Sequence, residues 1–109
     1  MGKLRNLPKD SPELLNDLID IREGRVISMA LSKSDSCQIM LLSFGDGESV
    51  SEETYFGDTF YYVLEGKMPV YEDGNKKVIH EGECLCVPKG VLHAVGGEGP
   101  FKILQITVE

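Results

Sequence analysis

The stretch Gly82-Glu-Cys-Leu-Cys-Val-Pro88-Lys-Gly90-Val-Leu-His93 predicts a strand, a tight turn and a histidine at a fixed offset from that turn. The four apolar residues 84–87 have the length of a buried strand, and Gly82 suits the corner before it. Pro88 cannot donate to a sheet ladder, so it marks the end of the strand, and Gly90 allows the chain to reverse. His93 therefore begins or follows a new strand.

Outward from this stretch, short β-prone runs alternate with turn residues at nearly regular spacing from residue 25 onward. This pattern is typical of an all-β sandwich or barrel, and no helical pattern of ten residues interrupts it. The Asp73-Gly74 pair is a tight-hairpin signal. We expect strands at 25–31, 37–44, 49–55, 59–65, 68–72, 76–80, 84–87, 92–95 and 101–108.

The N-terminal residues carry one helix-start signature. Ser11 is a capping residue ahead of Pro12, and acidic residues follow near the positive end of the expected helix. An alternating pattern that begins at Ile19 limits this helix to about two turns, and we expect it to pack across one end of the barrel. The expected organisation is one domain, with a helix and lead-in strand at 1–24 and a β-barrel at 25–109.

The last expected strand, 101–108, has two different faces. One face carries Gln105 and Thr107 beside apolar side chains, which suits a barrel interior with some polarity. The other face carries Leu104, Ile106 and Val108, and an apolar surface of this kind needs a cover. Packing against a second sheet would supply it, and so would a homodimer, which the surplus of outward aromatic residues also favours.

Composition excludes several partner classes. The chain has 109 residues and a net charge of −7, without a Lys/Arg cluster, which argues against binding to nucleic acid. It shows neither a signal-peptide core nor an apolar run that could form a membrane helix. Its three cysteines, Cys37, Cys84 and Cys86, are an odd number that fits free thiols in a reducing compartment. We expect a soluble cytoplasmic protein in which Cys84 and Cys86 share one strand face and pack in the core.

The spacing of Gly82, Pro88, Gly90 and His93 resembles the second motif of the cupins, G-x5-P-x-G-x2-H-x3-N, with Gly97 in place of the asparagine. The resemblance covers about residues 39 to 108. It implies a small single-domain cupin of the type-2 conserved barrel kind, whose fold is a double-stranded β-helix, or jelly-roll barrel. It also implies a homodimer.

The first cupin motif, G-x5-H-x-H-x3,4-E-x6-G, fits between Gly47 and Gly66 with its spacing intact, but its ligand positions are eroded. Glu53 and Tyr55 stand at the two histidine positions, and Thr59 stands at the glutamate position. Only His93, in the second motif, is the family's usual ligand type.

These positions predict one pocket. Glu53 and Tyr55 are two residues apart on an expected strand, so their side chains share a face. Thr59 and Tyr61 can enter the same lumen from the next strand, and the resemblance brings His93 to them. The predicted pocket is therefore Glu53, Tyr55, Thr59, Tyr61 and His93.

A metal in this pocket would be held by Glu53, Tyr55 and His93, and the resemblance implies Fe, Mn, Ni or Zn as the cofactor. A catalytic transition-metal site uses about three protein ligands and an open position, and the phenol of Tyr55 would have to ionise. The alternative for His93 is a hydrogen-bonded histidine of the barrel, paired with Glu53 or Tyr55. Such a group could also move protons without a metal.

Three functions follow from these patterns, and no residue is assigned a catalytic role. The first is a barrel that binds a small molecule in its lumen. The second, implied by the resemblance, is a metal-dependent enzyme of dioxygenase, isomerase or decarboxylase type that acts on a small organic acid, sugar or aromatic compound. The third is a dimeric barrel with a purely structural lumen.

Overall fold

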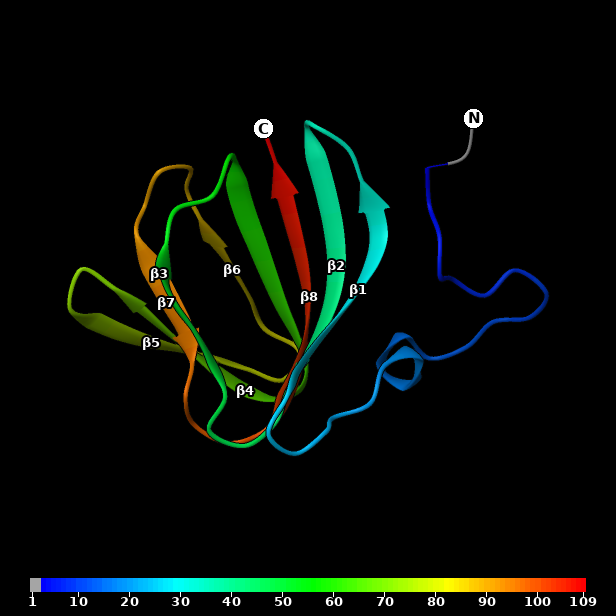
Figure 1. The fold of residues 1–109 in the computed structure, drawn as a ribbon, viewed down its shortest axis with the longest axis horizontal. Helices are drawn as coiled ribbons and strands as arrows, with labels where there is room; N and C mark the ends of the chain where they lie inside the picture. Colours follow the sequence, from blue (N-terminus) through cyan, green and yellow to red (C-terminus); the bar gives the residue numbers. More distant parts are fainter. Residues whose placement is uncertain (1–2) are drawn as a thin grey trace.

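The computed structural model describes residues 3–109, and nearly all of its regular structure is β-strand (Figure 1). The predicted all-β class is confirmed. The elements are η1 (Leu15–Leu18), β1 (Val26–Lys33), β2 (Cys37–Phe44), β3 (Ser49–Glu53), β4 (Asp58–Glu72), β5 (Asn75–His80), β6 (Cys84–Val87), β7 (His93–Gly96) and β8 (Phe101–Val108).

The strands form two curled sheets that share β4. The first half of β4 pairs with β6 and β8, and its second half pairs with β5 and β7. The first sheet therefore has the order β6-β4-β8-β2-β1, and the second has the order β5-β4-β7-β3, with antiparallel neighbours throughout. In Figure 1 the two sheets diverge from the bend of β4 and face each other. This is the jelly-roll arrangement predicted from the sequence.

The prediction of separate strands at 59–65 and 68–72 was wrong, because β4 runs through both without a break. Gly66 has the turn-like φ of 79°, yet it bends the strand instead of ending it. The pairing register with β8 shifts between Val63 and Glu65, just before the bend. A glycine inside a strand often marks such a bend, and here the bend carries the chain from one sheet into the other.

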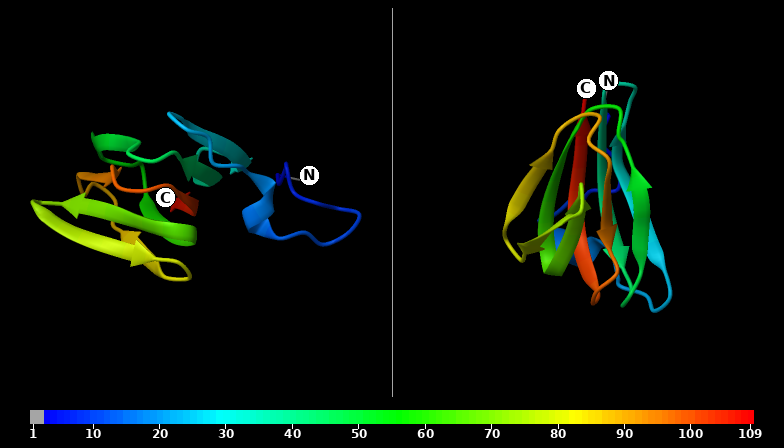
Figure 2. Two further views of the ribbon diagram at one scale, coloured as in Figure 1. Left: turned by 90° about the horizontal axis from the view of Figure 1, so that it is seen from below. Right: turned by 90° about the vertical axis from the view of Figure 1, so that its left-hand side faces the viewer.

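The predicted short N-terminal helix is present, but it is shorter than the two turns expected and packs elsewhere. The structure has a single 3-10 turn, η1, and its N-cap residue Leu14 makes no side-chain cap. Extended backbone resumes at Ile19, whose side chain is buried with Leu31 and Leu41 on the outer face of the first sheet. The N-terminal segment thus lies outside the barrel (Figure 2) and covers a sheet face, not a barrel end. It supplies part of the cover expected for Leu104, which packs in the same cluster.

The barrel interior has an apolar end and a polar end. At the apolar end, near Gly66, the stacked rings of Phe44 and Phe101 lie 4.4 Å apart between centroids. The polar end lies near the start of β4, where the buried side chains of Thr59 and Thr107 are register partners. The interior of β8 is therefore mixed in polarity, as its sequence predicts.

Cys84 and Cys86 are exposed, so the prediction that they pack in the core was wrong. Only one face of β6 is covered, and strand alternation gives that face to Leu85 and Val87. A four-residue apolar run predicts a strand but not which of its faces is covered, and β6 is an edge strand with one face outside the barrel.

Candidate functional site

The Pro-x-Gly turn places His93 inside the barrel. The amide of Val91 donates to the carbonyl of Pro88, and Gly90 has a φ of 82° that only glycine adopts readily. The amide of Lys89 donates to Asp58, which fixes this turn to the start of β4. His93 then opens β7 with only 2% of its surface exposed.

Both ring nitrogens of His93 are engaged by the protein. Nδ1 lies 3.0 Å from the carbonyl oxygen of Val91, which can only accept, so Nδ1 carries a proton. In the neutral ring Nε2 is then the acceptor, and the hydroxyl of Tyr61 donates to it at 2.7 Å. Because Tyr61 lies in the first sheet and His93 in the second, this hydrogen bond joins the two walls of the barrel.

Tyr55 and Glu53 extend this pair toward solvent. The Tyr55 ring is half-buried, with its centroid 5.1 Å from that of His93. Glu53 is the Cα partner of His93 across β3 and β7, and its side chain is exposed. The structure therefore brings together Glu53, Tyr55, Tyr61 and His93, four of the five predicted pocket residues.

Thr59 is engaged elsewhere. Its hydroxyl lies 3.2 Å from that of Thr107, and both side chains are buried. This pair links β4 and β8 within the first sheet, at the polar end of the interior.

Glu72 is a further residue beside His93 that the sequence reading missed. It is the Cα partner of His93 on the β4 side, and it follows the buried Val70 on the inward-facing alternation. Its carboxylate lies 3.7 Å from the amino group of Lys77. No local signal could have found it, because Glu72 precedes the Asp73-Gly74 hairpin and the β4–β7 register joins segments far apart in the sequence.

Burial keeps the two phenols protonated. Burial raises the pKa of Tyr55 to about 12; the Tyr61 hydroxyl acts in the opposite direction, and the Glu53 carboxylate adds to the rise. Burial, with Tyr55 and Glu53 beside it, also raises the pKa of Tyr61. Both phenols of the cluster are thus neutral at neutral pH.

The predicted metal ligands do not fit a transition metal in this arrangement. The lone pair of His93 Nε2 already accepts the Tyr61 proton, and the Glu53 side chain is exposed. Over residues 3–109, no three side chains of His, Cys, Asp or Glu converge as a metal site requires. We therefore derive no step through Fe, Mn, Ni or Zn.

The raised phenol pKa values predict a loss of stability in alkali. Since these values lie above the unfolded-state value of 10.0, the phenols stabilise the fold fully below pH 10 and lose that contribution as the pH rises toward 12. Urea unfolding from pH 8 to 12 should show this fall, and Tyr61→Phe should make it shallower. The exposed ion pair of Lys76 and Glu98 titrates in the same direction, so Lys76→Gln is the control. Equal pH slopes for the wild type and Tyr61→Phe would contradict the prediction.

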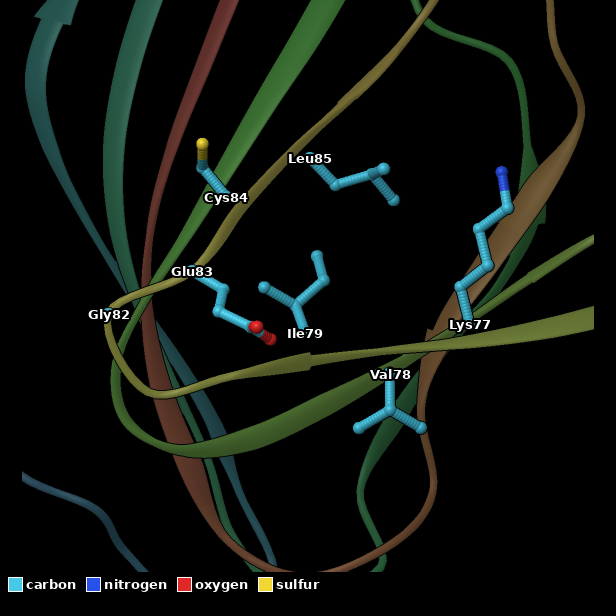
Figure 3. Close-up of a pocket in the computed structure, with 7 residues that line it drawn as sticks. All are labelled: Lys77, Val78, Ile79, Gly82, Glu83, Cys84 and Leu85. Atoms are coloured by element: carbon cyan, nitrogen blue, oxygen red, sulfur yellow. The ribbon is translucent and has the colours of Figure 1, made fainter.

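Two open cavities lie near this cluster without including it. One, of about 440 Å³, is lined by Glu52, Asp73, Gly74, Val91 and Leu92, on the outer side of the turn that precedes His93. The other, of about 400 Å³, lies between β5 and β6 (Figure 3). Neither is lined by a predicted pocket residue.

Comparison with known protein families shows which family the chain belongs to. The model of the cupin domain family matches residues 40–107. The chain belongs to the cupin family. The match spans both eroded and intact motifs, so the family predicted from Gly82, Pro88, Gly90 and His93 is confirmed.

Solved structures of other proteins share this fold. A cupin superfamily protein from Desulfitobacterium hafniense is 50% identical in sequence, and its crystal structure matches with a TM-score of 0.94 over 98% of both chains. A cupin 2 conserved barrel domain protein from Leptotrichia buccalis is 31% identical, with a TM-score of 0.84 over 87% of this chain and 46% of that one. A Streptococcus pyogenes protein of unknown function shares the fold at 21% identity, with a TM-score of 0.95 over 100% of this chain and 96% of that one.

The search of curated proteins found no match to this cupin. Between residues 3 and 109, no helix has the length and apolar character needed to cross a membrane.

Proposed function

We propose that this cupin binds a small organic molecule at the polar end of its lumen, against Tyr55, Tyr61 and His93. The observation that carries the proposal is the graded exposure of the cluster. A buried Tyr61–His93 pair is followed by a half-buried Tyr55 and an exposed Glu53. Polar groups in a barrel interior cost free energy that an apolar core would not, and this set leads from the interior to solvent.

The chemistry of the cluster favours a neutral or aromatic ligand with hydroxyl or carbonyl groups. Protonated phenols donate hydrogen bonds, and the faces of Tyr55 and His93 can stack on a ring. Glu53, at the exposed edge, accepts hydrogen bonds from ligand hydroxyls. An anionic group near Glu53 and Glu72 would be repelled.

A metabolite screen by thermal stabilisation tests this proposal. A ligand that binds only the folded protein raises its stability by mass action, about 2.7 kcal/mol at a hundredfold excess over the Kd. Tyr55→Phe should weaken the effect, because it removes a half-buried donor while keeping the ring. Tyr71→Phe is the matched control, since the Tyr71 hydroxyl donates to Glu98 on the exposed surface.

The other two functions have distinct outcomes in the same experiment. Stoichiometric transition metal in the purified protein, lost in His93→Ala, would support the metal-dependent enzyme instead. A library without a stabilising compound would support a purely structural lumen.

We also propose a homodimer that covers the outer face of the first sheet where the N-terminal segment does not. Phe60 and Ile106 are register partners there, and both point away from the interior that Tyr61 occupies. Cys84 and Cys86 lie opposite Tyr62 and Phe60 on the same face. A half-exposed apolar surface of this kind favours a partner.

Light scattering at micromolar concentration should give a mass of about twice 12.0 kDa. Ile106→Lys should produce the monomer, because it places a charge in the apolar face. Alkylation of Cys86 should be slower in the wild type than in this variant. A wild-type mass near 12.0 kDa would contradict the dimer.

A further inference from the structure

The cavity between β5 and β6 opens through the side of the barrel. Each of these strands pairs only with β4, so no hydrogen-bond ladder joins them and they form the edges of the two sheets. The cavity has a volume of about 400 Å³, within the range of small-molecule sites. It is lined by Lys77, Val78, Ile79, Gly82, Glu83, Cys84 and Leu85.

The floor of the cavity is apolar. Ile79 is 3% exposed and belongs to the inner core, and Leu85 packs against the same core. In Figure 3 the side chains of Ile79 and Leu85 point into the gap between the two strands, whereas Val78 points away from it. A hydrocarbon chain placed here would cover the partly exposed side chain of Leu85, next to the buried Ile79.

One end of the cavity carries a cation. Lys77 is two residues before Ile79 on β5, so its side chain rises from the same face, and Figure 3 shows it beside the gap. Its amino group is 3.7 Å from the Glu72 carboxylate, too long for a hydrogen bond, and its side chain is 52% exposed. Lys77 therefore has donors to spare.

The carboxylate at the other end is already engaged. Glu83 accepts from the backbone amide of His80 at 2.8 Å and lies 3.0 Å from the Nδ1 of the same residue. The backbone hydrogen bond, followed by the imidazole contact, lowers the pKa of Glu83 below its ordinary value. Figure 3 shows this carboxylate beside the end of β5, with Ile79 standing between it and Lys77.

We propose that this cavity binds a short-chain carboxylate, with its charged group on Lys77 and its hydrocarbon chain over Ile79 and Leu85. Charge complementarity favours the anion, because the Lys77 ammonium keeps donors beyond its 3.7 Å ion pair with Glu72, whereas Glu83 already accepts from His80. This site does not depend on the proposed lumen ligand, since neither Tyr61 nor His93 lines the cavity.

Titration of the full chain with hexanoate, followed by amide NMR, tests the proposal. Hexanoate should shift the amides of residues 77–79 and 82–85. Lys77→Gln should weaken its affinity about tenfold, the effect of losing one charge-assisted hydrogen bond. Lys76→Gln is the matched control, because Lys76 lies on the opposite face of β5 and pairs with Glu98; it should leave the affinity unchanged. Hexanol and hexylamine should bind more weakly than hexanoate.

The lumen variants separate this site from the proposed function. Tyr61→Phe should bind hexanoate as the wild type does. Hexanoate binding that is lost in Tyr61→Phe but kept in Lys77→Gln would place the ligand in the lumen and overturn the proposal. Equal binding of hexylamine, or no shifts at millimolar hexanoate, would overturn it as well.

Discussion

Gly66→Ala is expected to destabilise the barrel by about 3–5 kcal/mol, because both the backbone conformation and the close packing at this position disfavour a side chain. The φ of 79° places a non-glycine residue in the left-handed region, which alone costs about 1–2 kcal/mol. A Cβ would also lie 2.6 Å from the carbonyl oxygen of Pro100 and 3.1 Å from the Cβ of Phe101. These atoms cannot retreat easily, since Phe101 is fully buried and stacks on Phe44.

Gly74→Ala is the matched control for this prediction. Gly74 has a φ of 78°, and a Cβ there would meet no atom within 4 Å. It should therefore lose only the backbone contribution, about 1–2 kcal/mol. Urea denaturation of the two variants measures the difference, which isolates the close approach of β4 to β8. Equal losses would mean that the bend of β4 does not depend on this contact.

Gly66 also shows how far the sequence could predict the fold. Alternation and turn residues placed β2, β6 and β8 at the bounds that the structure has. A glycine such as Gly66 allows a positive φ, and a positive φ can either end a strand in a turn or bend a strand that continues. Local sequence cannot distinguish these two outcomes, because the choice depends on β5, β7 and β8 pairing with both halves of β4.

The N-terminal helix is shorter than predicted for a related reason. Ser11 and Pro12 are good helix-start residues, but helix formation competes here with burial of Ile19 against Leu31 and Leu41. A short helix is marginal on its own, so tertiary packing decides its length. Propensity alone therefore predicted a longer helix than the sheet surface allows.

The candidate site could be predicted in part. Strand alternation placed Glu53 and Tyr55 on one face with Tyr61 on the next strand, and the resemblance to the cupins brought His93 to them. The structure shows these four side chains together. The direct Tyr61–His93 hydrogen bond differs from the sequence prediction, which gave Glu53 or Tyr55 as the hydrogen-bond partner of His93. Which side chain reaches Nε2 depends on the separation of the two sheets, and no sequence spacing records that distance.

His93→Ala is expected to destabilise the protein by about 3–5 kcal/mol. It empties a ring-sized space at a buried position, and it leaves the hydroxyl of the fully buried Tyr61 without its His93 partner. His80→Ala is the matched control, because the only other histidine in the chain is an exposed residue on β5. A surface substitution of this kind should change the stability by about 0.5 kcal/mol or less.

A double-mutant cycle with Tyr61→Phe then measures the hydrogen bond itself. Tyr61→Phe alone should cost about 1–3 kcal/mol, since it leaves the buried Nε2 of His93 without a donor. If the two side chains act as a unit, the double variant should lose less than the sum of the single variants, by about 1 kcal/mol or more. Additive losses would instead mean that the Tyr61–His93 hydrogen bond contributes no measurable coupling free energy. Apolar packing would then hold the two walls of the barrel together without help from this hydrogen bond.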